Sequence, residues 1–178
     1  MLGLVLSRRN FREADQIISL YTLEQGKVEV LARGVKKITS KNSAHLEPFS
    51  YIDAEIIPGK ELPHLGAVQS LEYFSHIRQD LQKSLVASFV VNFLNKILHD
   101  GEKDERLFTV TLDFIKYLNQ ESTVCNLELI DGYIVKLLHC LGYDIQIIKA
   151  NPDHEFIYNF LVNQLERKIG DWKKLFLA

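Results

Sequence analysis

The chain has little cysteine. Only two of its 178 residues are cysteine, Cys125 and Cys140, and both lie in apolar sequence that is typical of helices. Buried free thiols in a reducing compartment explain such a pair, with a disulfide or a metal pair as the alternatives. Zinc requires about four nitrogen or sulfur ligands at suitable spacing. The sequence offers no such set, so we expect no metal and no other cofactor.

The chain also lacks the signatures of enzymes. It contains no Gly-x-Ser-x-Gly, His-Glu-x-x-His or phosphate-cradling glycine loop, and its histidines are scattered: His45, His64, His76, His99, His139 and His154. Glu13 and Asp15 stand beside three arginines, which favours ion pairs over a catalytic dyad. Asp153 and Glu155 fit the first turn of a helix, where acids are stabilised by the macrodipole. We therefore predict that the protein is not an enzyme.

Long hydrophobic runs are missing as well. No apolar stretch reaches the roughly 20 residues that a membrane helix needs. The first arginines follow the short apolar run LGLVL, the reverse of a signal peptide, so a cytoplasmic protein without a membrane segment is expected. At 47% hydrophobic and 25% charged residues, the chain can bury a core in one domain or in two small ones.

Positive charge is concentrated at the amino-terminal end. Residues 1–45 contain eight Lys and Arg against four Asp and Glu, a net charge of +4, so the other residues carry −6 of the total of −2. Because local field rather than total charge steers a ligand, this asymmetry favours a surface that faces a polyanion. Chance is the alternative explanation of an asymmetry of this size.

Short β-branched segments alternate with turn residues in the first part of the chain. They predict five strands, at residues 2–6, 16–22, 27–32, 50–57 and 64–71. Turn residues such as Gly26 and Gly34 punctuate them, which is typical of a small Greek-key barrel. The run at 16–22 is apolar on both faces, so parts of both should be covered. Strand number alone leaves an OB-like and an SH3-like barrel open.

The apolar period becomes helical after Tyr73. It recurs in four segments, roughly residues 81–97, 105–119, 127–141 and 152–167. We expect Gly142 to cap the third segment, and Asn151 and Pro152 to be the N-cap and the first residue of the fourth. Apolar stripes of this width cannot face water, so the helices should pack into a bundle.

Residues 1–45, which we call the basic front, have the composition of a site for single-stranded nucleic acid. Such strands are held by cations that follow the phosphates and by aromatic rings on which bases stack. We predict that seven side chains bind phosphates: Arg8, Arg9, Arg12, Arg33, Lys36, Lys37 and Lys41. Phe11 is a candidate stacking ring among them, although burial in the core is favoured for this residue alone. A solvated basic turn is the alternative for the whole block.

Several motifs follow one another in an order that points to one protein family. They are GLVLSRRNFREADQIISLYT, LEQGKVEVLARGVKK, LEPFSYIDAEI, YIVKLLHCLGYDIQI and LERKIGDWKKLFL. The matching positions are Arg9, Phe11, Glu13, Asp15, Thr22, Gly26, Lys27, Arg33, Gly34, Lys37, Ser40, Leu46, Pro48 and Phe49. In this order they resemble the RecO family of bacterial recombination mediators. The resemblance implies an α+β protein, with an OB-like five-stranded β-barrel at residues 1–75 and an α-helical bundle domain at 76–178.

The resemblance also implies a function in DNA repair and recombination. RecO-like proteins bind single-stranded DNA, promote strand annealing and, with the RecR partner, help to load RecA, which would make this protein nucleoid-associated. Duplex DNA is an alternative ligand, and the acidic tail of single-stranded DNA-binding protein is a further partner of the family. The second hypothesis is a protein-interaction adaptor of the recombination machinery with weak or no DNA binding.

The helical half departs from the family pattern. Many RecO-like proteins carry a four-cysteine zinc module after the Leu-Gly-Tyr motif, and this chain is similar to a form without it. Asp131 and Gly132 stand where an Arg commonly precedes the aromatic, so an acidic peptide would meet like charge. We expect close packing at Gly132, because a helical glycine costs roughly 1 kcal/mol relative to Ala. Trp172 and Phe176 are expected in the core, with an exposed docking patch as the alternative.

Overall fold

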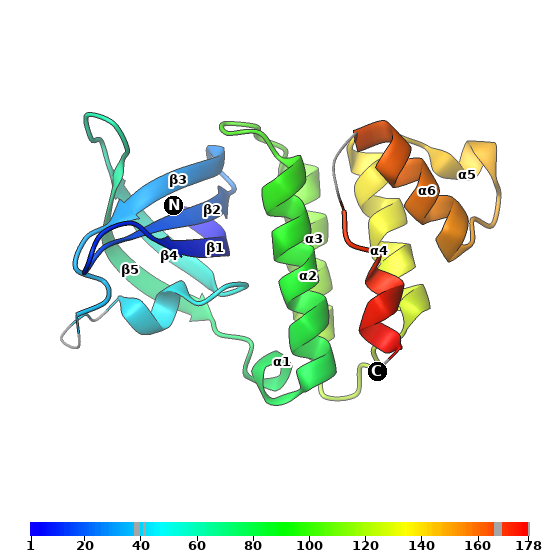
Figure 1. Ribbon diagram of the computed structural model, residues 1–178, viewed down its shortest axis with the longest axis horizontal. Helices are drawn as coiled ribbons and strands as arrows, with labels where there is room; N and C mark the ends of the chain where they lie inside the picture. The colour runs from blue at the N-terminus through cyan, green and yellow to red at the C-terminus, as the bar shows by residue number, and fades with distance from the viewer. Residues whose placement is uncertain (38–39, 41, 166–168, 178) are drawn as a thin grey trace. The chain divides into compact units, whose positions relative to one another are not determined.

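A computed structural model describes residues 1–37, 40, 42–165 and 169–177 of the chain (Figure 1). The chain forms two compact units. The barrel unit comprises Met1–Phe74 with Val90–Glu105, and the helical unit comprises Ser75–Phe89 with Arg106–Ala178. The domain limits read from the sequence, 1–75 and 76–178, stay a prediction.

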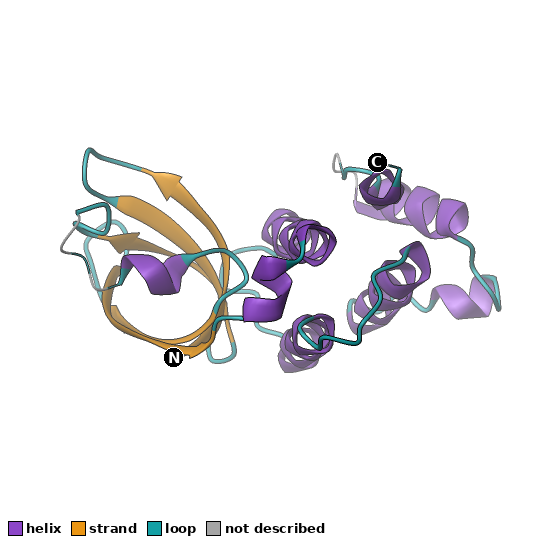
Figure 2. Cartoon of the chain, turned by 90° about the horizontal axis from the view of Figure 1, so that it is seen from below, coloured by secondary structure: helices purple, strands orange, loops and turns teal. Residues whose placement is uncertain are grey.

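The barrel unit is built on five strands that close on themselves (Figure 2). The strands are β1 Leu2–Asn10, β2 Gln16–Thr22, β3 Gly26–Ala32, β4 Tyr51–Ile57 and β5 His64–Glu72. Their order is β1-β2-β3-β5-β4, and β4 pairs with β1 to close the barrel. All neighbours are antiparallel except β3 and β5, which run parallel. The predicted α+β fold with an amino-terminal OB-like barrel is confirmed, and β1 continues beyond its predicted end at Leu6.

Both faces of β2 are buried, as its apolar sequence predicts. Ile18 and Leu20 point into the barrel core with Val5, Val30 and Ile52. The other face of the strand carries polar groups that bond to the 90–105 part of the unit. The Ser19 hydroxyl lies 2.8 Å from Asn95 Oδ1, and Tyr21 donates to the carbonyl of Asp104 at 2.9 Å. Buried hydroxyls on this face are therefore satisfied, which a buried strand requires.

Lys27 directs its charge into the barrel unit rather than toward solvent. Its Nζ donates to the carbonyls of Asn95 (2.7 Å) and Leu98 (3.2 Å), at the carboxyl end of α2 (Leu81–Ile97). Asp100 Oδ1 lies 3.8 Å from the same nitrogen. A cation is favourable at a helix carboxyl end because it meets unsatisfied carbonyls and the negative pole of the dipole. Lys27 is thus one cation of the basic front that serves the fold.

The helical unit contains the remaining long helices. They are α3 Glu105–Leu118, α4 Leu127–Cys140 and α6 His154–Leu165, with the short elements α1 Ser75–Gln79, α5 Ile145–Ile148 and η2 Trp172–Phe176. The barrel unit has one short 3-10 helix, η1 Ser43–Leu46. The helices follow the four predicted segments closely, and the short elements were not predicted, because one turn is too short to show a period. The predicted end of the last segment at residue 167 lies outside the described residues.

The ends of α4 and α6 test the predicted caps. Gly142 has a φ of +87°, and the amides of Gly142 and Tyr143 bond back to the carbonyls of His139 and Leu138, so the predicted cap of α4 is confirmed. The predicted start of α6 at Asn151 and Pro152 is wrong. Asp153 is the capping residue instead, because its Oδ1 accepts from the amide of Phe156 at 3.0 Å.

A polar cluster ties the carboxyl-terminal segment to α4. Asp131 Oδ1 accepts from the Trp172 indole at 2.7 Å and lies 2.9 Å from His154 Nδ1. The other ring nitrogen of His154 lies 3.0 Å from Asp171 Oδ1. Trp172 is 1% exposed and packs on the rings of Phe89 and His154. The prediction that Trp172 belongs to the core is confirmed.

Gly132 and the two cysteines lie in the helical unit, and the sequence made a prediction for each of them. Gly132 is exposed on α4, and a Cβ atom there would meet nothing within 4 Å, so the predicted close packing is wrong. Cys125 and Cys140 are half-buried and are not joined in a disulfide. The sequence predicted buried thiols, so the predicted extent of burial is wrong for both. Burial raises the pKa of the Cys125 thiol.

Gly26 is a turn residue whose replacement should cost considerable stability. It has a φ of +70°, and a Cβ atom there would collide with the carbonyl of Glu102. Gly26→Ala should lower the free energy of unfolding by more than about 2 kcal/mol in a denaturant titration. Gly101→Ala is the matched control, since Gly101 has a similar φ of +76° and open space around it. It should cost only about 1 kcal/mol, and equal losses would show that the contact with Glu102 is unimportant.

Gly132→Ala should instead raise the free energy of unfolding. Alanine gains roughly 0.5–1 kcal/mol over glycine in a helix interior, and no atom opposes the added methyl group. We expect a higher denaturation midpoint with an unchanged m-value. A loss of stability would indicate that the backbone of α4 needs glycine at this position.

Asp171 should make stability depend on pH. Burial raises the pKa of its carboxyl, but hydrogen bonds from the Lys173 amide and His154, with the charges of His154 and Lys174, hold it below the usual 3.8 on balance. A carboxylate with a lowered folded-state pKa stabilises the fold above pH 3.8, and this contribution is lost as the pH falls through that lowered pKa. Asp171→Asn should therefore be less stable by about 1 kcal/mol at pH 7.

The difference between Asp171→Asn and the unsubstituted protein should shrink as the pH falls below 3.8 in urea titrations. Asp113→Asn, an equal change of charge at an exposed position on α3, is the control and should show little pH-dependent difference. A gap for Asp171→Asn that is constant with pH would mean that the ionised carboxylate is not what stabilises the cluster.

Candidate nucleic-acid interface

Three segments meet at one end of the barrel. They are the turn between β1 and β2 (residues 11–15), the segment after β3 (33–37) and the loop between β4 and β5 (58–63). β1 and β2 form a hairpin, β3 returns beside β2 to the same end, and β5 begins there because Leu31 pairs with His64. We call this the basic end. The loops between β1 and β2 and between β4 and β5 are in the positions that OB-folds use to bind oligonucleotides.

Hydrogen bonds fix the first two segments to each other and the third to β3. Asp15 Oδ1 accepts from the Gly34 amide at 2.8 Å, and the Lys36 amide donates to the carbonyl of Ala14 at 3.0 Å. The Leu31 amide donates to the carbonyl of Pro63 at 2.8 Å. Asp15 thus serves the fold through a backbone amide, rather than through the ion pair with arginine that its sequence position favours.

The basic end carries more cations than acids. Arg12, Arg33, Lys36 and Lys37 are all exposed there, and the fold adds Lys60 from the loop between β4 and β5. Glu13, Asp15 and Glu61 are the acids of the same segments. Sequence reasoning missed Lys60, because its loop is separated by more than 40 residues from Arg12. The Gly-Lys pair at 59–60, read together with the OB strand order, is the signal that could have found it.

Two of the predicted arginines have carboxylate partners. Arg8 Nη1 lies 2.7 Å from Glu47 Oε1, and Arg9 Nη2 lies 2.9 Å from Glu29 Oε2. These pairs offset charge that would otherwise face a polyanion. Lys41, the seventh predicted residue, lies outside the described residues.

Phe11 is not in the core, so the interpretation favoured for it is wrong. Its side chain is 44% exposed, because the turn between β1 and β2 carries it past the end of the barrel. The guanidinium carbon of Arg12 lies 5.0 Å from the centre of its ring, a cation–π contact. An exposed aromatic ring beside cations is what stacking of nucleic-acid bases requires.

A cleft of about 270 Å³ opens beside Phe11. Leu31 and Leu62 provide apolar walls, and Arg33 and His64 lie on its lining with one nitrogen of each 3.2 Å apart. Lys60 and Glu61 come from the loop between β4 and β5. The cleft therefore combines apolar surface with a rim that is mainly cationic.

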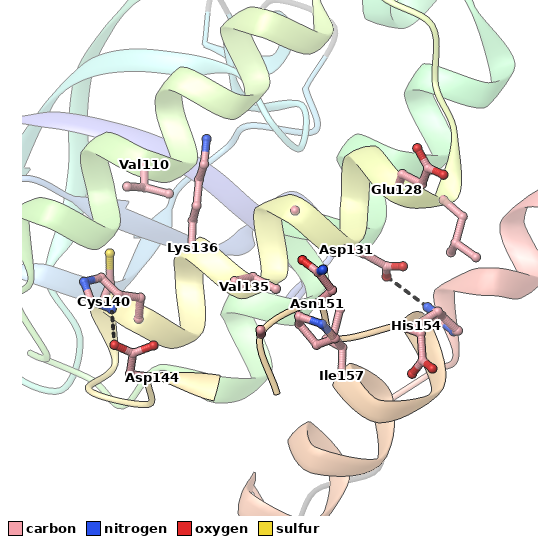
Figure 3. Close-up of a pocket in the computed structure, with 16 residues that line it drawn as sticks. Val110, Glu128, Asp131, Val135, Lys136, Cys140, Asp144, Asn151, His154 and Ile157 are labelled. Atoms are coloured by element: carbon pink, nitrogen blue, oxygen red, sulfur yellow. Dashed lines mark hydrogen bonds and ion pairs between the residues drawn. The ribbon is translucent and has the colours of Figure 1, made fainter. Parts of the chain in front are cut away.

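A larger groove of about 920 Å³ lies in the helical unit (Figure 3). Side chains of α4 and α6 line it, with apolar groups such as Val135 and Ile157. Figure 3 shows Asp131 facing His154 at one side of this groove. Glu128 and Asp144 also line it, against the single lysine Lys136. The groove is thus partly apolar and more acidic than basic.

Several polar groups that line the helical groove have partners within the fold. His154 is held between Asp131 and Asp171, and Asp153 pairs with Lys149 at 3.0 Å, so these groups have partners within the fold. Among residues 1–37, 40, 42–165 and 169–177, no group of three or more His, Cys, Asp or Glu side chains is placed to hold a metal ion. Of the helices in this described part, none has the length and apolar character that crossing a bilayer requires.

Both parts of the chain match models of one protein family. The model described as recombination protein O, N terminal, matches residues 1–74, and the model of the C-terminal part matches residues 78–149. The matched ranges include the β1–β2 turn and the segment after β3, and also α4 in the helical unit.

Curated relatives carry the name DNA repair protein RecO. The one from Geobacter metallireducens is 29% identical over 153 residues, which are 82% of this chain and 63% of the relative. The one from Syntrophomonas wolfei is 30% identical over 141 residues, 79% of this chain and 56% of the relative. The one from Geobacter sulfurreducens is 31% identical over 145 residues, 82% of this chain and 59% of the relative. The chain spans somewhat more than half the length of these relatives, and the two family matches together show that it belongs to the RecO family.

Proposed function

We propose that this protein acts in DNA repair by binding single-stranded DNA at the basic end of its barrel. The observation that carries the proposal is the exposed ring of Phe11 in a cleft rimmed by Arg12, Arg33 and Lys60. Cations for the phosphates and a ring for the bases are the two elements of single-strand binding. The names of the curated relatives support a role in DNA repair.

Binding of this kind would be independent of sequence. Arg12, Lys36 and Lys37 are exposed and meet phosphates, which every nucleotide carries. Neutralising the phosphates of two complementary strands lets the strands approach each other, and base pairing then supplies the free energy of annealing. No bond is made or broken in this process, so the proposed function requires no catalytic group. Duplex DNA offers the same phosphates and is an alternative ligand.

The proposal extends to recombination mediation. Membership of the RecO family supports cooperation with a RecR-like protein and assistance in loading RecA, which would place the protein at the nucleoid. The helical groove is the surface that we assign to a protein partner. Since Asp131 is engaged by His154 and Trp172, its charge opposes an acidic tail of single-stranded DNA-binding protein less than the sequence suggests. Glu128 and Asp144 still line the groove against Lys136.

A protein-interaction adaptor is the second candidate function. It is favoured by the ion pairs of Arg8 and Arg9, which reduce the charge available to DNA, and by the size of the helical groove. The adaptor would bind its protein partner with little dependence on salt and would have negligible affinity for free DNA.

Reversal of charge at the basic end tests the DNA-binding proposal. Lys36→Glu with Lys37→Glu should weaken binding of a labelled single-stranded oligonucleotide about tenfold or more at low salt, measured by fluorescence anisotropy. If each lysine meets one phosphate, the slope of log affinity against log salt should flatten by about 1.4.

The matched control carries the same change of charge elsewhere on the barrel unit. Lys96→Glu with Lys103→Glu alters exposed residues, and Lys103 lies beside Gly26, at the opposite end of the barrel. This variant should keep most of the affinity and the slope. Equal losses of affinity in both variants would mean that net charge, rather than the basic end, causes the loss. If the unsubstituted protein binds no DNA, the adaptor function is favoured.

A further inference from the structure

We propose that the cleft beside Phe11 is a subsite for one unstacked nucleobase, an inference that rests on the proposed single-strand binding. Phosphate contacts alone would need only exposed cations. The cleft adds an aromatic ring and apolar walls, and it is also lined by His64, whose Nδ1 is buried without a partner. Together these groups fit a flat, neutral heterocycle rather than another phosphate.

The cleft has an apolar interior that suits a base and cations around it that suit phosphates. Phe11, Leu31 and Leu62 give it an apolar interior, while Arg33 and Lys60 supply charge from two different segments. Glu61 also lines the cleft, and its carboxylate would repel a phosphate that entered. A base has no net charge, so it can enter while its phosphates stay on the cationic rim.

The ring of Phe11 is available for stacking. It is 44% exposed, and Arg12 lies over it with the guanidinium carbon 5.0 Å from the ring centre. A base can stack on the ring where Arg12 leaves it open, or replace the guanidinium there. Either arrangement keeps Arg12 next to the phosphate of the same nucleotide. Stacking of this kind tolerates every base, because every base has a π-face.

His64 contributes a nitrogen without a partner. Arg33 Nη2 lies 3.2 Å from His64 Nε2, and a guanidinium can only donate, so Nε2 accepts and Nδ1 carries the hydrogen. Nδ1 is buried and is the one such side-chain N or O atom, among the described residues, with no hydrogen-bond partner. A buried donor of this kind is costly. An acceptor atom on a base edge in the cleft would satisfy it after a small adjustment of the lining.

The walls of the cleft are held in place before any ligand arrives. The amide of Phe11 donates to the carbonyl of Asp15 at 3.2 Å, and Asp15 in turn accepts from the amide of Gly34. The amide of Leu31, another lining residue, donates to the carbonyl of Pro63. A preformed site loses less conformational entropy on binding, so even one stacked base can add measurable affinity.

The test compares two ligands with the same number of phosphates. One is a labelled oligothymidylate and the other is an oligonucleotide of the same length made of abasic sites. The unsubstituted protein should bind the oligothymidylate more tightly. Phe11→Ala should weaken binding of the oligothymidylate by about fivefold to a hundredfold, leave binding of the abasic strand unchanged and preserve the salt slope.

The Phe11→Tyr variant should restore the preference for the strand with bases, because it keeps an aromatic ring. Phe11 is 44% exposed, so Phe11→Ala should stay folded, with at most a modest loss of stability in a denaturant titration. The base subsite is overturned if Phe11→Ala weakens both ligands alike or neither, while the lysine variants still lose affinity. Absence of binding to either strand by the unsubstituted protein would overturn the proposed function itself, and the subsite with it.

Discussion

The parallel pairing of β3 with β5 is the constraint on which the geometry of the barrel unit depends. The two strands are more than 30 residues apart in the chain, yet they meet where Leu31 pairs with His64. This pairing brings the loop between β4 and β5 to the end where β1 turns into β2. Lys60 then lines the same cleft as Arg12, a cleft between segments that no local pattern connects. The strand order therefore decides both the shape and the charge of the basic end.

Partners within the fold decide which cations of the basic front can meet a ligand. Lys27 caps the carboxyl end of α2, and Arg8 and Arg9 form ion pairs with glutamates. Arg8 and Arg9 are also exposed, but their glutamates offset their charge, whereas Arg12 and Lys36 lie at the basic end itself. Surface ion pairs contribute little to stability, so a polyanion can compete for Arg8 and Arg9. We expect it to do so only after the cations of the basic end are engaged.

In the helical unit, too, a charged residue has partners within the fold that the sequence does not reveal. Asp131 looks like an acidic obstacle to a peptide when the sequence is read alone. In the fold it accepts from the Trp172 indole and faces His154, whose other nitrogen faces Asp171. This cluster fastens the carboxyl-terminal segment to α4 and α6. A buried polar network of this kind is stable only when every member is satisfied, which ties the three elements together.

The sequence by itself determined the elements and the class of fold. Short β-branched runs between turn residues predicted the five strands, because such residues favour extended backbone. Helical periods predicted α2, α3, α4 and α6, because that period records which side of a helix is buried. Motif order also predicted the RecO family. Gly142 was correctly read as a cap, since a left-handed residue after a helix is a local requirement.

Only the tertiary structure decided which residues form the candidate site. Phe11 looked like a core residue because it is aromatic, but it lies beyond the barrel end and is exposed. Lys60 gained its neighbours from a long-range strand pairing, and Gly132 turned out to pack against nothing. The reason is physical: burial, ion pairing and cleft formation depend on residues far apart in the chain. Local sequence records the side chains but not their partners.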